Sequence, residues 1–102
     1  MEVEYVVPLG ENARKRHLHE TSRGTVVRFV VQLKVFLDGK WRPVVRYDSV
    51  HGFTHVDWYK RSGESRKEQL PFTFAEALTV ADEDILERWE VYRNRFLEGE
   101  WP

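Results

Sequence analysis

The sequence contains no cysteine, which excludes disulfide bonds and metal sites built from thiolates. It has no apolar run close to the roughly 20 residues that a membrane-spanning helix needs. The N-terminal segment is already polar and acidic at Glu4, unlike a secretory signal, so we expect a soluble, cytoplasmic protein. The formal net charge is only −1, so bulk charge gives no argument for nucleic-acid binding.

What the chain does contain indicates a folded protein. Its 102 residues are 41% hydrophobic and 14% aromatic, which suits a single domain over residues 1–102 and argues against disorder. Charged residues make up 32% of the chain, so a local basic face is still compatible with the near-zero net charge.

The segment from Thr25 to Leu37 is the clearest strand. Every odd-numbered residue from Val27 onward is apolar, and Arg28, Gln32 and Lys34 stand among the even-numbered ones. A period of two with β-branched residues is typical of a strand that has one buried face.

A hairpin is predicted at Asp38-Gly39, leading into a second strand from Trp41 to Asp48. Its odd-numbered residues, including Trp41 and Tyr47, would face the core. Because pairing odd with odd requires an odd loop, we predict a three-residue connection with Gly39 in a left-handed conformation.

A third long strand is predicted from Phe53 to Lys60, with Val56 and Trp58 facing the core. A four-residue connection, Ser49–Gly52, keeps this facing and pairs Arg46 with His55.

The remaining segments complete the outline. Residues 1–9 predict a short edge strand, residues 11–24 a polar loop, and residues 61–70 a turn followed by a short charged edge strand. Thr73 and Glu76 have the spacing of a capping box, and apolar residues then recur as on one helix face: Phe74, Leu78, Ala81, Ile85, Trp89, Tyr92 and Phe96. One helix, or two pieces with a kink near Thr79, would fit, with Gly99 as a stop.

These elements predict an α+β fold. We expect a curved, mostly antiparallel sheet of four to five strands, with a long C-terminal helix packed on one face. The other face would carry polar residues and has no obvious cover.

The segment from Arg46 to Lys60 concentrates reactive side chains on that polar face. One chemistry that fits is metal-free phosphodiester cleavage, with histidines moving protons, an aspartate orienting them and an arginine holding phosphate. The catalytic candidates are His55, His51, Arg46 and Asp57. The candidates for binding are Asp48, Tyr59, Arg42, Arg28 and Lys34.

Three other interpretations stay open. His51, His55 and Asp57 have the residue types of a two-histidine, one-carboxylate metal site, but the cation of Arg46 beside them disfavours a dication, so we predict no metal and no cofactor. The face could instead bind single-stranded nucleic acid or a protein partner. The charged residues could also be ordinary cross-strand pairs on a solvated surface. For the basic run Arg14–Arg16, with His17 and His19, we expect a solvated loop in preference to a nucleic-acid contact.

The string from Val45 to Asp57, of the form R-Y-D-x-x-H-G-x-x-H-x-D, resembles that of a group of small uncharacterised prokaryotic proteins. It is similar, more distantly, to TumE-type toxins of toxin–antitoxin pairs, through Arg46, Tyr47, Asp48, His51, His55 and Gly63. That resemblance implies translation-blocking RNA cleavage and a cognate small protein partner. We therefore expect an RNA-directed, ribonuclease-like protein, with a non-enzymatic binding module (antitoxin-like, adaptor or RNA-binding) and a homodimer as alternatives.

Overall fold

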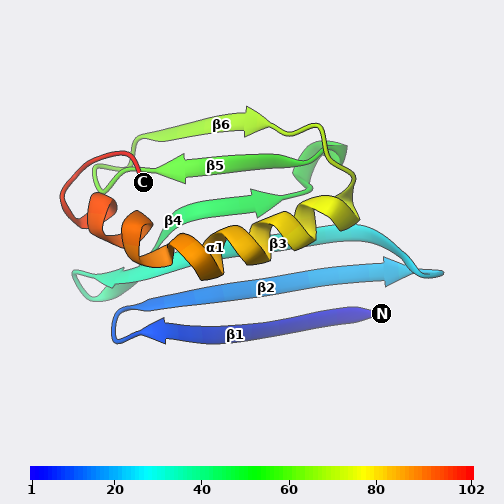
Figure 1. The fold of residues 1–102 in the computed structure, drawn as a ribbon, viewed down its shortest axis with the longest axis horizontal. Helices are drawn as coiled ribbons and strands as arrows, with labels where there is room; N and C mark the ends of the chain where they lie inside the picture. The colour runs from blue at the N-terminus through cyan, green and yellow to red at the C-terminus, as the bar shows by residue number, and fades with distance from the viewer.

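The computed structural model describes residues 1–102, which form one antiparallel sheet with one long helix on one side (Figure 1). The elements are β1 (Glu2–Gly10), β2 (Ala13–Ser22), β3 (Thr25–Leu37), β4 (Lys40–Asp48), β5 (His55–Tyr59), β6 (Ser65–Gln69) and α1 (Phe74–Leu97). The strands lie in chain order, each antiparallel to the next. The α+β class and the antiparallel sheet are confirmed, but the sheet has six strands where four to five were predicted.

The additional strand is β2, in the segment that we predicted as a loop. Its register places Lys15 opposite Leu33 and His17 opposite Val31, so these polar residues point to the same side as the core of β3. A strand whose buried face carries Lys and His has no apolar period, and the sequence pattern therefore contains no strand signal there.

The core lies between β3, β4 and the helix. It contains the odd-numbered residues of β3 from Phe29 to Val35 and one stripe of α1. Its fully buried members include Phe29, Leu33, Val45, Ile85 and Phe96. The helix is a single piece from Phe74 to Leu97, and the predicted apolar stripe is the one that faces the sheet. None of the helical segments has the length and apolar character needed to cross a membrane.

The hairpin between β3 and β4 differs from the prediction. Phe36 pairs with Trp41 and Leu37 with Lys40, so the turn has two residues, Asp38 and Gly39, both with positive φ (53° and 81°). This is the type I′ pattern that twisted strands favour, not a three-residue loop.

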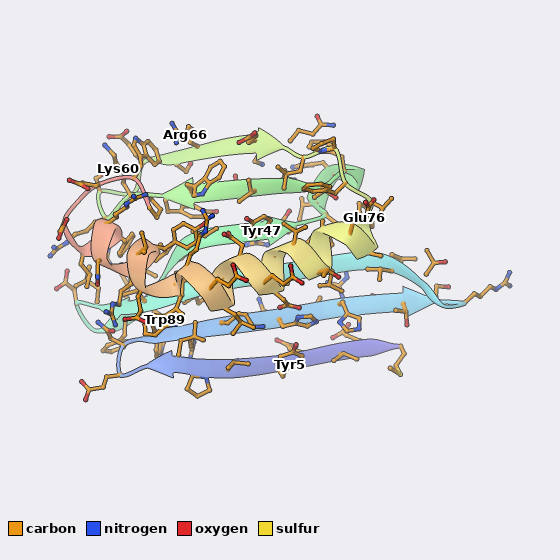
Figure 2. The ribbon with its side chains drawn as sticks, in the orientation of Figure 1. Tyr5, Tyr47, Lys60, Arg66, Glu76 and Trp89 are labelled. Atoms are coloured by element: carbon orange, nitrogen blue, oxygen red, sulfur yellow. The ribbon has the colours of Figure 1, made fainter.

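A bulge in β4 then restores the predicted facing. Leu33 pairs with Val45 and Lys34 with Pro43, so Val44 is an extra residue. Before the bulge, Trp41 faces away from α1. Beyond it, Tyr47 pairs with Val31 and faces α1. Tyr47 therefore lies under the middle of the helix, as Figure 2 shows.

The connection from β4 to β5 is longer than predicted. It spans residues 49–54 and includes a short 3-10 turn at Val50–Gly52. Asp48 pairs with His55 and Arg46 with Asp57, a shift of two residues from the predicted register. Because the connection is still even in length, Val56 and Trp58 face the core as expected.

Candidate functional site

The predicted site residues gather on the sheet face that points away from α1, which we call the open face. Arg46 and Asp48 come from β4, and His55 and Asp57 from β5. These two strands pair Asp48 with His55 and Arg46 with Asp57. Cross-strand partners on one face have neighbouring side chains, so the register alone brings the four groups together.

Asp48 is the centre of the hydrogen bonding. Its Oδ2 accepts a hydrogen bond of 2.6 Å from Nε of Arg46, and its Oδ1 lies 2.6 Å from Nε2 of His55. The backbone N–H of Val50 also donates to Oδ1, at 3.0 Å. The carboxylate is only 3% exposed, and its three donors replace the water it has lost.

His55 is the most enclosed member, at 1% exposure. Its Nε2 faces both carboxylates, 2.6 Å from Asp48 and 3.5 Å from Oδ2 of Asp57. Its Nδ1 has no hydrogen-bond partner. Neither ring nitrogen can reach a substrate in this arrangement, because Nε2 faces the carboxylates and Nδ1 is buried. The imidazole therefore positions the two carboxylates.

The connection from β4 to β5 encloses His55 on the open face. The ring of Phe53 lies 5.5 Å from the His55 ring, and that of His51 lies 6.5 Å from it. His51 itself is exposed and has a positive φ of 73°, which turns the chain back over the site. Ser49 anchors the start of the connection, because its Oγ accepts a 3.0 Å hydrogen bond from the Phe29 N–H.

Burial also changes the acidity of this cluster. Desolvation raises the pKa of Asp57, and the Asp48 carboxylate raises it further, while Lys67, His55 and Arg46 act in the opposite direction. The pKa of Tyr59 is raised by burial and then by Asp57. A carboxyl group with a raised pKa can exchange protons nearer neutrality than an ordinary one.

A pocket of about 470 Å³ opens above these groups. It is lined by five predicted residues and three others: Arg46, Asp48, His55, Asp57 and Tyr59, with Val50, Ser65 and Lys67. The pocket is polar and open, so it suits a charged group of a larger ligand better than an apolar small molecule.

The donor atoms of Asp48, His55 and Asp57 lie within 4.8 Å of one another, a spacing that a divalent cation could bridge. Two features oppose a metal here. Arg46 lies 2.6 Å from one carboxylate and Lys67 3.9 Å from the other. A metal-bound imidazole also normally donates its second N–H to an acceptor, and Nδ1 of His55 has none.

The family model for a domain of unknown function, DUF7718, matches residues 1–101. The chain belongs to the DUF7718 family. No curated protein and no solved structure matches it.

Three predicted binding residues of this DUF7718 chain, Arg42, Arg28 and Lys34, do not line the pocket. Arg42 precedes the bulge, so it pairs with Val35 and bonds the carbonyl of Leu37 instead of lying beside Arg46. The placement predicted for Arg42 is therefore wrong, because the two-residue turn reverses its facing. Arg28 is on the open face, but its guanidinium is engaged by Glu2 and Glu20, at 3.0 and 3.3 Å.

Lys34 lies on the open face beside Arg14 and Arg16, which we predicted in a loop, and beside Arg46. Arg14 pairs with Lys34 across β2 and β3, while Arg16 and Arg46 flank Gln32 on either side. We call Arg14, Arg16, Lys34 and Arg46 the basic cluster. Burial lowers the pKa of Lys34, and the three arginines lower it further. The sequence does contain an indication of this cluster. Arg14 and Arg16 are two residues apart, and on a strand that spacing puts both arginines on one side.

Trp41 joins this cluster, although we predicted it in the core. Its ring meets Phe36 edge-on at 5.4 Å, and the Arg14 guanidinium lies 4.0 Å from its centroid. The two-residue turn again explains the difference, because it moves Trp41 to the open face of the DUF7718 sheet.

Proposed function

We propose that the open face binds single-stranded RNA. The observation that carries this proposal is the basic cluster, in which four cations from three adjacent strands crowd on one uncovered sheet face. Arg16 is paired with Glu4 at 2.9 Å and Arg46 with Asp48 at 2.6 Å, but Lys34 and Arg14 have no carboxylate within ion-pair distance. Bringing like charges together costs free energy in the unliganded protein, and a phosphate backbone would relieve that cost.

An aromatic surface adjoins the cations. Trp41 and Phe36 stack edge to face, and Arg14 lies over Trp41. Aromatic rings and guanidinium planes are the groups on which unstacked bases lie in complexes with single strands. A duplex offers few such bases, so the surface favours a single strand.

The polar pocket beside the basic cluster extends the proposed RNA-binding surface. Arg46 belongs to both the cluster and the pocket, since it bonds Asp48 and flanks Gln32. A phosphate held by Arg46 and Lys34 would place the adjoining nucleotide over Asp57 and Tyr59. The carboxyl group of Asp57 could then accept hydrogen bonds from a ribose hydroxyl or a base amine.

The test is fluorescence anisotropy with a labelled oligouridylate and with a hairpin duplex of the same length. We expect tighter binding of the single strand, and a log–log salt slope of about −0.7 for each phosphate that the protein neutralises. Lys34→Gln should make that slope less steep, whereas Arg95→Gln, on the exposed side of α1, serves as the matched control and should not. Equal effects of the two substitutions, or no binding at low salt, would reject the proposal.

Cleavage of the bound RNA is the second candidate, in line with the resemblance to TumE-type toxins. The observation that favours it is Asp57, whose raised pKa suits proton transfer and which lies opposite Arg46 in one pocket. In this role Arg46 would hold the phosphate, and His55 and Asp48 would position the carboxyl group. His51, exposed and 6.5 Å from His55, would be the second proton carrier.

Purified protein incubated with RNA separates the two candidates. Turnover that falls in Asp57→Asn and Arg46→Ala, but not in Arg95→Gln, would support cleavage. His51→Ala tests the second proton carrier, and His55→Ala is interpretable if circular dichroism confirms its fold. Binding without turnover leaves an RNA-binding module, and a single co-purifying protein with no RNA affinity favours the adaptor alternative. A solution mass measurement tests for the homodimer.

A further inference from the structure

A second cluster of titratable side chains lies on the opposite face of the sheet, under α1. Strand β2 sends Lys15, His17 and His19 to that face, because residues two apart on a strand point the same way. His17 is only 3% exposed, whereas His19 is partly exposed. None of these residues takes part in the proposed RNA site.

A chain of polar contacts links this cluster to the helix. Nδ1 of His17 lies 3.1 Å from Oδ1 of Asp82, and Nε2 of His17 lies 2.6 Å from Nδ1 of His19. The carboxylate can only accept, so Nδ1 of His17 carries a proton. The two imidazole nitrogens are close enough that a single proton must lie between them.

We propose that His17 and His19 bind a late first-row divalent metal of the Zn²⁺, Ni²⁺ or Cu²⁺ class in place of that proton. Imidazole nitrogens are the ligands that these ions share, and a His-x-His pair on a strand presents two of them side by side. Two nitrogens bound tetrahedrally to one ion lie about 3.3 Å apart, from metal–nitrogen distances near 2.0 Å. The two nitrogens are now 2.6 Å apart, so binding would require the partly exposed His19 ring to rotate slightly away from His17.

Asp82 supports this assignment. A metal-bound histidine characteristically donates its other N–H to a carboxylate, which fixes the tautomer and the ring orientation. His17 has this arrangement already, and the stacked ring of Tyr5, 4.5 Å away at 13°, holds the imidazole plane. Tyr5 is labelled in Figure 2, on β1 beside the helix-facing side of β2. Nδ1 of His55 on the open face has no such acceptor. The two histidine sites therefore differ in whether a carboxylate accepts the N–H of the nitrogen that would not bind the metal.

Lys15 sets a limit on the affinity. Its ammonium lies 2.8 Å from the same Asp82 oxygen and is 3% exposed. This fixed cation opposes a dication nearby, so Lys15→Gln should tighten metal binding, whereas a purely structural network would only lose an ion pair.

The experiment is a titration of the ¹⁵N-labelled protein with zinc chloride, followed by long-range ¹H–¹⁵N correlation of its four imidazoles. We expect the Nε2 signal of His17 and the Nδ1 signal of His19 to shift together and saturate, while His51 stays unchanged. Isothermal titration calorimetry with zinc chloride then compares variants. His19→Ala should lower the affinity at least tenfold and Asp82→Ala by about 10- to 100-fold. His51→Ala is the matched control and should leave the affinity unchanged.

Several results would overturn the proposal. Signals of His17 and His19 that stay fixed at millimolar zinc exclude the site. Saturating shifts at His55 instead would move the metal to the open face. If Asp82→Ala fails to fold, His19→Ala still decides the matter, because an unchanged zinc affinity in that variant contradicts ligation by His19.

Discussion

The hydroxyl of Tyr47 on β4 donates a 2.7 Å hydrogen bond to Oδ2 of Asp84 on α1, which ties the middle of the sheet to the middle of the helix. The hydroxyl of Tyr92 lies 2.8 Å from each oxygen of the same carboxylate. Burial raises the pKa of both tyrosines, and the hydrogen bonds to Asp84 raise it further. The fold therefore favours the neutral phenols.

Stability is expected to fall in alkali because of these two tyrosines. Above pH 10 or so, unfolded tyrosine loses its proton while Tyr47 and Tyr92 keep theirs, so the folded state binds more protons. The free energy of unfolding should then drop by up to about 1.4 kcal/mol per pH unit for each tyrosine. Urea denaturation between pH 8 and 11 measures this slope. Tyr47→Phe should flatten it and cost about 2 kcal/mol at pH 7, because it removes a hydrogen bond to a charged group. Tyr5→Phe, whose hydroxyl makes no hydrogen bond in the fold, should do neither.

Removing the carboxylate of Asp48 is expected to lower the stability of the fold more than removing any other acidic group. Asp48→Ala removes the acceptor shared by Arg46, His55 and the Val50 N–H, and it should destabilise by about 3 kcal/mol or more. Chemical denaturation at pH 7 measures the loss. Glu4→Ala is the control: Glu4 is also paired with an arginine, but it is exposed, so its loss should cost less than about 1 kcal/mol. Similar losses in the two variants would contradict the burial argument.

Asp57 is expected to reduce stability at neutral pH. Because its folded pKa is raised, the folded state binds more protons than the unfolded state once the pH passes the ordinary aspartate value. Stability that is present at low pH is thus lost as the pH rises from the ordinary aspartate pKa through the raised pKa of folded Asp57. Asp57→Asn should stabilise the protein at pH 7 and show no gain below about pH 3.5, where an ordinary aspartate is itself protonated. Melting curves from pH 3 to 7 would contradict this if the variant were less stable throughout.

The start of α1 should depend on Thr73. Its hydroxyl accepts from the Glu76 N–H at 3.2 Å, and the Glu76 carboxylate accepts from the Thr73 N–H at 3.1 Å. Thr73→Ala breaks this capping box and should cost about 1 kcal/mol. Thr79→Ala makes the same change at an exposed position inside the helix and should cost little, since alanine favours helix. Thermal denaturation of the two variants compares them directly, and equal losses would argue against the cap.

The sequence predicted those parts of the fold whose buried face is apolar. The alternation of β3 and the helical stripe from Phe74 to Phe96 follow from the need to bury one side, and the structure confirms both. Strand β2 was missed because its buried side carries Lys15 and His17, whose burial depends on Asp82, far away in the chain.

The candidate site was predicted in composition but not in detail. Facing depends only on whether a connection is odd or even, so Arg46, Asp48, His55 and Asp57 were correctly assigned to one face. The pairing depends on the actual length of the connection, which the Ser49 and Thr54 hydrogen bonds help to determine. Trp41 and Arg42 were misplaced because no local sequence pattern indicates the extra residue Val44. Without that bulge, only a three-residue turn would put Tyr47 in the core, and such a turn would also have put Trp41 there.

That extra residue couples two positions in the hairpin that otherwise look independent. The length of the turn and the presence of Val44 each decide to which face the later side chains of β4 point. Adding one residue to the turn, or deleting Val44, would by itself turn Asp48 toward α1 and Tyr47 away from it. Insertions and deletions within residues 38–44 can therefore be inherited only in compensating pairs. A family member whose turn is one residue longer should lack the counterpart of Val44, and an alignment gap at one place should be matched by a gap at the other.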